Sequence, residues 1–151
     1  MKAAADPATP PEVQTPSRTA ILLNPLDWLQ AAGRALLSLL FIWDGIAQLL
    51  HPDVTVQYFA SAHVPFPGVA VWISIPLHLL GGLALLVGVR ARLVASLLAL
   101  LALGTAFGVH LPAADPANLL HFYKNLAIAG GLLYVVACGA GRVSIERDGH
   151  W

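Results

Sequence analysis

The sequence predicts an all-α protein, an integral membrane four-helix bundle with both termini in the cytoplasm. Hydrophobic residues make up 58% of the 151 residues and charged residues only 11%, whereas soluble domains carry about 25% charged residues. Four long apolar segments follow one another, and the connections that carry Lys or Arg alternate with connections that carry none. Lipid is therefore the expected solvent, and the expected location is a bacterial inner membrane, crossed several times.

Residues 1–24 precede the first apolar segment and contain four prolines among Ala, Thr and Gln. They lack the apolar centre of a secretory signal, so a disordered cytoplasmic tail is expected. Asn24-Pro25-Leu26-Asp27 then has the residues of a helix start, with Asn as the cap, Pro at the first helical position and an acid in the first turn. The membrane domain is expected over residues 25–146, and a short cytoplasmic tail over 147–151.

A membrane-spanning helix needs about 20 mainly apolar residues. Four segments approach this length: residues 29–50, 69–89, 93–111 and 119–138. Each must be helical, because lipid offers the backbone no other hydrogen-bond partner. The first segment contains Arg34, and it spans the membrane if this side chain extends to the interface.

Basic residues predict the orientation. They precede the first span, fill the turn between the second and third, and follow the fourth: Lys2 and Arg18, Arg90 and Arg92, and Arg142 and Arg147. Residues 51–68 and 112–118 contain neither Lys nor Arg. By the positive-inside rule, both termini and the Arg90–Arg92 turn face the cytoplasm.

Glycine pairs in the last three spans are expected to let helices approach closely. They are Gly81 and Gly82, Gly104 and Gly108, and Gly130 and Gly131. Pro76 also lies within a span and cannot donate to the carbonyl of Trp72, so a kink is expected there. We interpret these residues as structural.

Polar side chains gather in the outer half of the predicted bundle. At about 1.5 Å per helical residue, Asp44 and His78 both fall near mid-membrane on successive spans, and Gln48 shares the face of Asp44. The rest of the set lies nearer the outer surface: His51, His110, His121, Lys124 and Asn125. Because the Pro76 kink falls close to His78, the sequence predicts a polar pocket that opens outward.

A charge at the membrane centre costs about 2.5–3.5 kcal/mol, so Asp44 and Lys124 are expected to face inward and to pair, directly or through neighbours. We assign ligand-binding or proton-relay roles to Asp44, Gln48, His78, His110, His121, Lys124 and Asn125. The alternative is that polar residues only join helices, at about 0.6 kcal/mol each; it stays open for Gln48, Asn125 and Ser74. The histidine spacing supports no metal site.

Composition excludes two classes of function. Lys and Arg number 8 and Asp and Glu number 8, which leaves no basic excess to bind nucleic acid. Cys138 is the only cysteine, so no thiol pair is available for redox chemistry. The chain also has no nucleotide-binding loop and no nucleophile triad, so catalysis in isolation is not expected.

Several short motifs follow a fixed order along residues 34–146. They are Arg34, Phe41 and Gly45; Tyr58 with Val64-Pro65; Gly81–Gly88 before Arg92; His110; Lys124-Asn125-Leu126 with Gly130-Gly131; and Gly139–Glu146. In order and spacing they resemble the DoxX family of bacterial four-span inner-membrane proteins. The resemblance makes His110, Lys124 and Asn125 family-like positions. Asp44 and His78 depart from the pattern, since many relatives have a small or apolar residue and a Glu there, and many have a Lys in place of Gln48.

The resemblance implies an association with membrane redox complexes, because the family is named after a subunit associated with thiosulfate:quinone oxidoreductase. We expect an inner-membrane subunit whose pocket holds a quinone, with Lys124 and His110 donating to its carbonyl oxygens and Asp44 and His78 relaying protons. The alternative is a non-catalytic adaptor that anchors or stabilises a partner enzyme. A transporter is less favoured, because the four spans show no repeated half.

Overall fold

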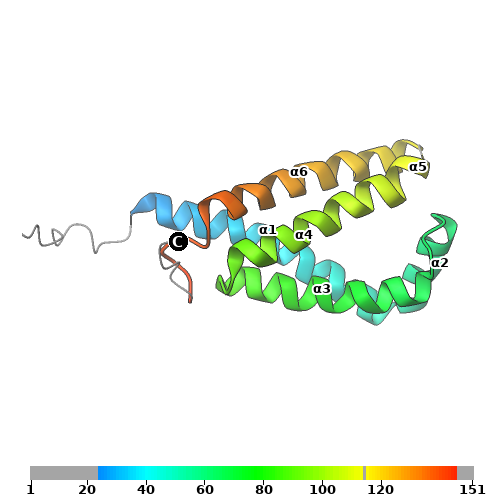
Figure 1. Ribbon diagram of the computed structural model, residues 1–151, viewed down its shortest axis with the longest axis horizontal. Helices are drawn as coiled ribbons and strands as arrows, with labels where there is room; N and C mark the ends of the chain where they lie inside the picture. The colour runs from blue at the N-terminus through cyan, green and yellow to red at the C-terminus, as the bar shows by residue number, and fades with distance from the viewer. Residues whose placement is uncertain (1–23, 114, 146–151) are drawn as a thin grey trace, which may run out of the picture.

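In the computed structural model, four long helices form a bundle (Figure 1). The structure describes residues 24–113 and 115–145, and these segments contain helices and no strand. The expected terminal tails lie almost wholly outside the described residues. The long helices are α1 (Pro25–Leu50), α3 (Pro67–Val87), α4 (Ala91–Thr105) with its π-helical continuation η2 (Ala106–His110), and α6 (Pro116–Cys138). All four are long and apolar enough to cross a membrane, which confirms the predicted all-α, membrane four-helix bundle; the cytoplasmic location of the termini stays a prediction.

Helix caps determine where the spans begin. At the start of α1 the Asn24 side chain accepts a hydrogen bond from the Leu26 amide at 3.2 Å, and the Asn24 amide donates to Asp27 at 2.7 Å. This reciprocal capping confirms the predicted helix start. In α6 the carboxylate of Asp115 accepts from the amides of Ala117 and Asn118. The helices therefore begin a few residues before the apolar segments, because hydropathy marks the lipid-facing part and the caps mark the helix.

The bundle consists of two helix pairs, α1 with α3 and α4 with α6. Glycines bring α1 and α3 into backbone contact. A Cβ atom at Gly82 would lie 3.1 Å from the amide nitrogen of Ile42 and 3.2 Å from the carbonyl oxygen of Ser38. A Cβ atom at Gly45 would lie 2.9 Å from the Cβ of His78. Gly82 therefore lets α1 and α3 approach closely, as expected. Gly45, which belongs to the motif on α1, does the same from the other helix.

Other glycines behave differently from the prediction. Cβ atoms at Gly81 and Gly131 would touch the side chains of Leu98 and Leu37, at 3.0 and 3.4 Å. At three further positions no atom of the described chain lies within 4 Å of a built Cβ: Gly104, Gly108 and Gly130. The predicted close helix contact at these three glycines is wrong within the single chain, because they lie on the outward side of α4–η2 and α6.

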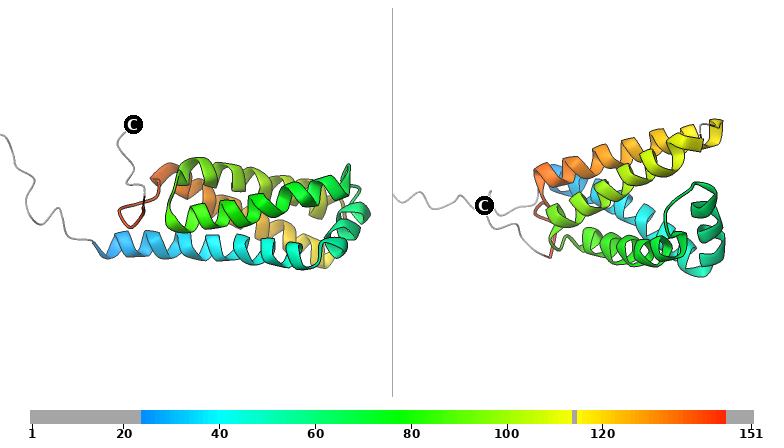
Figure 2. Two further views of the ribbon diagram at one scale, coloured as in Figure 1. Left: turned by 90° about the horizontal axis from the view of Figure 1, so that it is seen from below. Right: turned by 45° about the vertical axis from the view of Figure 1, so that its right-hand side comes forward.

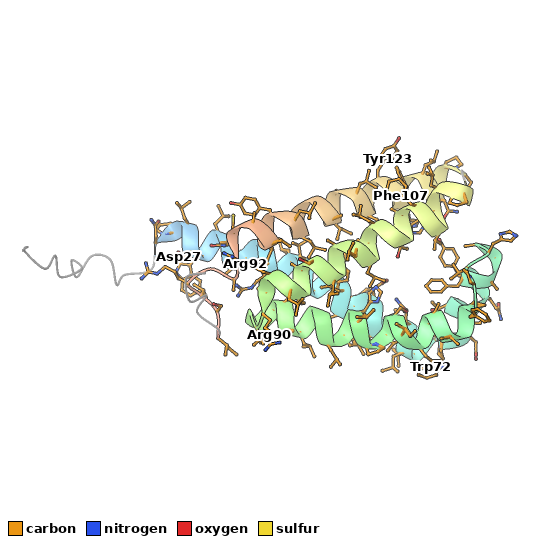
Figure 3. All side chains as sticks on the ribbon, viewed as in Figure 1. Asp27, Trp72, Arg90, Arg92, Phe107 and Tyr123 are labelled. Carbon is orange, nitrogen blue, oxygen red and sulfur yellow. The ribbon has the colours of Figure 1, made fainter. Side chains whose placement is uncertain are left out.

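We call the end that holds Asn24 and Ile145 the basal end and the opposite end the distal end; Asp27, Arg90 and Arg92 lie at the basal end (Figure 3). Arg34 is buried there, 4% exposed. It donates to the carbonyl oxygens of Ala140, Val143 and Leu86. Residues 139–145 fold back across the basal end and supply two of these carbonyls, so Arg34 is bound within the bundle at this end. We call residues 139–145 the basal hook.

The two helix pairs diverge toward the distal end, while α1 runs straight along the whole bundle (Figures 1 and 2). The distal end carries α2 (Pro52–Ser61) and the three-residue α5 (Leu111–Ala113). The sequence predicts residues 52–61 only as part of a connection between spans, because a ten-residue segment of this polarity is too short to cross a membrane. Its start signals, Pro52 at the first position and Asp53 in the first turn, were nevertheless present. Pro76 lies inside α3, which continues through it from Pro67 to Val87.

Candidate ligand-binding site

A cavity of about 1040 Å³ occupies the distal half of the bundle. α1, α2, α4 with η2, and α6 supply most of its wall, and α3 contributes His78. All of the side chains assigned a role from the sequence line this one cavity: Asp44, Gln48, His78, His110, His121, Lys124 and Asn125. Its remaining wall is mainly apolar, as is usual for a ligand pocket. Pro76, expected beside the pocket, is not part of the wall.

The deepest polar contact joins α1 to α3. The Nε2 atom of His78 lies 3.3 Å from Oδ2 of Asp44, and the Nδ1 atom lies 2.8 Å from the carbonyl oxygen of Ser74. Since a carbonyl only accepts, Nδ1 carries a hydrogen. The contact between Nε2 and the carboxyl group then requires one further proton, held either by the imidazole or by the acid. Asp44 and His78 are therefore placed to share a proton.

A second link orients this pair. Ser74 donates through its hydroxyl to Oε1 of Gln48, and Nε2 of Gln48 donates to Oδ2 of Asp44 at 3.4 Å. Gln48 and Ser74 are both buried, whereas the side chain of Asp44 is 60% exposed. The interpretation of Gln48 and Ser74 as polar links between helices therefore fits the structure. The same link directs the Asp44 carboxyl group toward the cavity.

At the distal end, Tyr58 connects three elements. Its hydroxyl lies 3.0 Å from Nδ1 of His110 and donates to Oδ1 of Asn118 at 3.1 Å. His110 Nδ1 also lies 3.1 Å from that oxygen, and the ring of His121 stacks on His110 with centroids 5.3 Å apart. We call Tyr58, His110 and Asn118 the distal latch, because they join α2 to η2 and α6.

Electrostatics at the latch favour an uncharged tyrosine. Burial raises the pKa of Tyr58, and the nearby charge of Asp115 raises it further. The amide side chain of Asn118 donates to Asp115 and lowers the pKa of that carboxyl group, with help from backbone amides. Asp115 is thus anionic and Tyr58 protonated at neutral pH.

The π-helical segment determines where His110 points. A π-turn adds one residue to a helical turn, which rotates the following side chains by about 100°. His110 ends this segment, is only 7% exposed, and contacts the latch. Residue counting along the span places His110 near its outer end, but hydropathy does not predict this rotation. Asn118 and Tyr58 are not among the site residues expected from the sequence. Tyr58 entered only as part of a motif.

Lys124 acts on Asp44 without a direct contact. Asp44 pairs with His78, and no ion pair or hydrogen bond joins Lys124 to another described side chain, but the charge of Lys124 still acts on Asp44. Lys124 lines the cavity from α6, with His121 one turn earlier on the same helix face and Asn125 beside it. The cavity therefore has a cation on one wall and a proton-sharing pair on another. Among the described residues, no group of three His, Cys, Asp or Glu side chains is placed to hold a metal ion.

Comparison with known proteins agrees with this architecture. The DoxX family model matches residues 29–111. The chain is 39% identical over 114 residues to "Inner membrane protein YqjF" of Escherichia coli strain K12, covering 76% of this chain and 86% of that protein. It is 34% identical over 115 residues to "Inner membrane protein YphA" of the same strain, covering 72% and 81%. No solved structure matches significantly. With its four membrane-spanning helices, the chain is a multi-pass inner-membrane protein and belongs to the DoxX family.

Proposed function

We propose that this protein is a membrane subunit that binds a lipid-soluble quinone in the distal cavity and works with a partner oxidoreductase. The observation that carries the proposal is the cavity itself, which brings Lys124, His110 and the Asp44–His78 pair to one apolar-walled space. Its volume, about 1040 Å³, suits a ring with several isoprene units, since ligand pockets of about 300–1,000 Å³ hold drug-sized molecules.

The polar groups match the needs of a quinone ring. Its two carbonyl oxygens accept hydrogen bonds, and Lys124 and His110 supply donors. Reduction to the quinol takes up two electrons and two protons. The Asp44–His78 pair is placed to pass both protons to the ring, one after the other. The partner oxidoreductase supplies or accepts the electrons, so the protein's own part is binding and proton transfer, a common use of intramembrane acids and histidines.

Lys124 provides a further argument. A cation inside a membrane costs about 2.5–3.5 kcal/mol on insertion scales. Lys124 makes no direct ion pair among the described residues, so its presence on the cavity wall favours a ligand that accepts a hydrogen bond. We also propose that the basal end, with Arg90 and Arg92, faces the cytoplasm. The cavity then lies in the outer half of the membrane.

A non-catalytic adaptor is the second candidate. The Gln48–Ser74 link favours it, because this bond joins α1 to α3 without facing a ligand. In that case the polar groups fix helix packing, and the protein purifies with a partner protein but without a quinone.

Extraction of bound lipid-soluble molecules tests the proposal. The protein is purified in mild detergent, and its quinone content is measured for wild type, Lys124→Met and the charge-conserving Lys124→Arg. We expect quinone in the wild type, about tenfold weaker binding in Lys124→Met, equivalent to about 1.4 kcal/mol, and partial recovery in Lys124→Arg. Arg92→Met, which removes a basal cation, is the matched control and should retain quinone. Wild type without quinone, or Lys124→Met with undiminished content, would contradict the proposal.

A further inference from the structure

We infer that the cavity opens sideways into the lipid between α1 and α6, so that its ligand enters from the membrane with an apolar tail left in this opening. The inference rests on the proposed quinone function and adds the route and the shape of the ligand. Its evidence is the arrangement of α1 and α6 and the closure of both ends of the bundle.

α1 and α6 form a fork. Near the basal end they touch, since Gln30 donates to the carbonyl oxygen of Gly139 at 3.3 Å and a Cβ at Gly131 would lie 3.4 Å from the side chain of Leu37. Just beyond Leu37 and Gly131, toward the distal end, side chains of both helices become cavity wall, beginning with Leu39 on α1 and Ile128 on α6. Leu37 and Gly131 therefore mark the base of the fork.

Both ends of the bundle are closed by specific contacts. At the basal end, the basal hook lies across the helices, held by Arg34 and by the bond from the Ile145 amide to the Val87 carbonyl at 3.0 Å. At the distal end, Tyr58 joins α2 to η2 and α6, and Val54 and Phe59 of α2 form part of the cavity wall. Between these ends, the α1 side of the fork is where exposed side chains line the cavity.

The side chains at this opening are those of a lipid-facing surface. Leu39, Leu40 and Trp43 line the cavity, yet they are 55%, 39% and 75% exposed. Because these three α1 residues line the cavity and remain exposed, they lie at its lateral edge. Behind them, Asp44 and Lys124 supply polar groups from the two arms of the fork. Apolar side chains at the opening and polar groups behind them suit an amphipathic molecule, whose polar ring lies inside the cavity and whose apolar chain passes Trp43. We call Leu39, Leu40 and Trp43 the lateral mouth.

Tryptophan fluorescence tests the lateral mouth. One variant keeps Trp43 alone (Trp28→Phe, Trp72→Phe, Trp151→Phe), and its control keeps Trp72 alone. Trp72 is also exposed, at 62%, but it lies on α3 away from the α4–α6 pair (Figure 3) and is not part of the cavity wall. Each protein is reconstituted in phosphatidylcholine–phosphatidylglycerol vesicles and titrated with a benzoquinone that carries a ten-carbon chain. We expect saturable quenching of Trp43 at a low quinone fraction and only gradual, collisional quenching of Trp72. Equal, unsaturated quenching of both would overturn the inference.

A second pair of variants tests the route without fluorescence. Leu40→Trp should obstruct the lateral mouth, whereas Leu36→Trp adds the same bulk one turn nearer the basal end, outside the cavity wall. We expect about tenfold weaker binding of the ten-carbon quinone to Leu40→Trp, little change for a tail-less benzoquinone, and wild-type binding of both by Leu36→Trp. If both quinones bind Leu40→Trp as they bind wild type, the mouth is elsewhere although the proposed function survives. If neither quinone binds even the wild-type protein, the proposed function itself fails.

Discussion

The contact between Asp44 and His78 is the point in this structure where two ionisable side chains depend most directly on one another. His78 is held on its other side by the Ser74 carbonyl, so its Nε2 atom has the Asp44 carboxyl group as its partner at 3.3 Å. Without Asp44, Nε2 of His78 loses this partner, whereas Asp44 without His78 keeps the hydrogen bond from Gln48. The side chain of Asp44 is largely open to the cavity, whereas that of His78 is buried. Loss of Asp44 should therefore lower stability more than loss of His78, because it leaves a buried imidazole without this partner.

A double-mutant cycle tests this dependence. Asp44→Asn and His78→Leu should each lower thermal stability in detergent, and the double variant should recover part of the loss. Contacting pairs show interaction energies of about 0.5–3 kcal/mol, and we expect about 1–2 kcal/mol here because one partner is exposed to the cavity. Strictly additive losses would show that the two side chains do not interact. Recovered stability with lost quinone binding would favour the redox proposal over the adaptor.

At this scale, helical spacing was sufficient to place Asp44 and His78 at the same depth, and the structure brings them into contact. Helical spacing did not predict that Lys124 makes no direct ion pair among the described residues or that Asn118 completes the latch. Depth follows from counting residues along a helix. Which neighbours a side chain contacts depends on the rotation of its helix about the axis. η2 changes this rotation at His110, and hydropathy gives no information about it.

Among the elements, α2 depends most on side-chain bonds for its position. It contributes no buried residue to the core, and Tyr58 joins it to η2 and α6. Tyr58→Phe should therefore lower the free energy of unfolding by about 0.5–1.5 kcal/mol and increase amide hydrogen exchange in residues 52–61. Tyr123→Phe, which removes an exposed hydroxyl of α6, is the control and should change neither. Unchanged exchange in α2 would mean that the latch does not hold it.

The raised pKa of Tyr58 predicts a pH effect with a definite sign. The folded protein keeps the phenol proton at pH values where the unfolded chain, with an ordinary pKa of 10.0, has begun to lose it. The stabilisation is present below pH 10 and is lost as the pH rises further. Tyr58→Phe should lose less stability than the wild type as the pH rises above 10, as measured by thermal unfolding at a series of alkaline pH values. An identical alkaline loss in the variant would assign the effect to other groups.

Two glycines, Gly82 at the contact between α1 and α3 and Gly104 away from any contact within the described chain, give a pair of contrasting predictions. Gly82→Ala should cost about 1–3 kcal/mol, because the new methyl group would press on backbone atoms of Ile42 and Ser38 that cannot easily move. Gly104→Ala meets no atom within 4 Å and should be neutral or stabilising by up to about 1 kcal/mol. Thermal unfolding of both variants in the same detergent checks the contrast. Similar losses in both would indicate that Gly104 also contacts a neighbour, such as a second copy of the chain.

The helices themselves were largely predictable, since apolar length and cap residues locate α1, α3, α4 and α6 to within a few residues. Glycine motifs were a weaker guide: Gly82 lies at a helix contact and Gly130 does not, although Gly81-Gly82 and Gly130-Gly131 are both adjacent glycine pairs. The difference arises from which face of each helix meets a neighbour. That choice is made by the packing of the whole bundle.

For the whole molecule, the orientation in the membrane remains a prediction from the basic residues. In a Cys138→Ser background, Arg92→Cys and Ser61→Cys report on the basal and distal ends. A membrane-impermeant maleimide added to intact cells should label Ser61→Cys and leave Arg92→Cys unlabelled until the membrane is opened. The opposite pattern would invert the topology and place the cavity in the inner half of the membrane.

Two opposed features of the bundle explain why its cavity could be only partly foreseen. Arg34 and the basal hook hold the helices together at one end, while the pairs diverge at the other (Figure 1). The sequence predicted an outward-opening polar pocket from the distribution of polar residues alone. The divergence of α1 from α6, which makes the pocket a large cavity with a lateral mouth, depends on contacts between residues about 100 positions apart.

Photoaffinity labelling tests the central claim, quinone binding in the distal cavity, most directly. The reconstituted protein is irradiated with an azido-substituted benzoquinone that carries a ten-carbon chain, and the labelled peptides are identified by mass spectrometry. We predict labelling in residues 39–48 of α1 and 121–128 of α6, both of which line the cavity, and competition by excess quinone without the azide. Labelling spread over the exposed face of α3 around Trp72 and Ile73, without competition, would contradict the account.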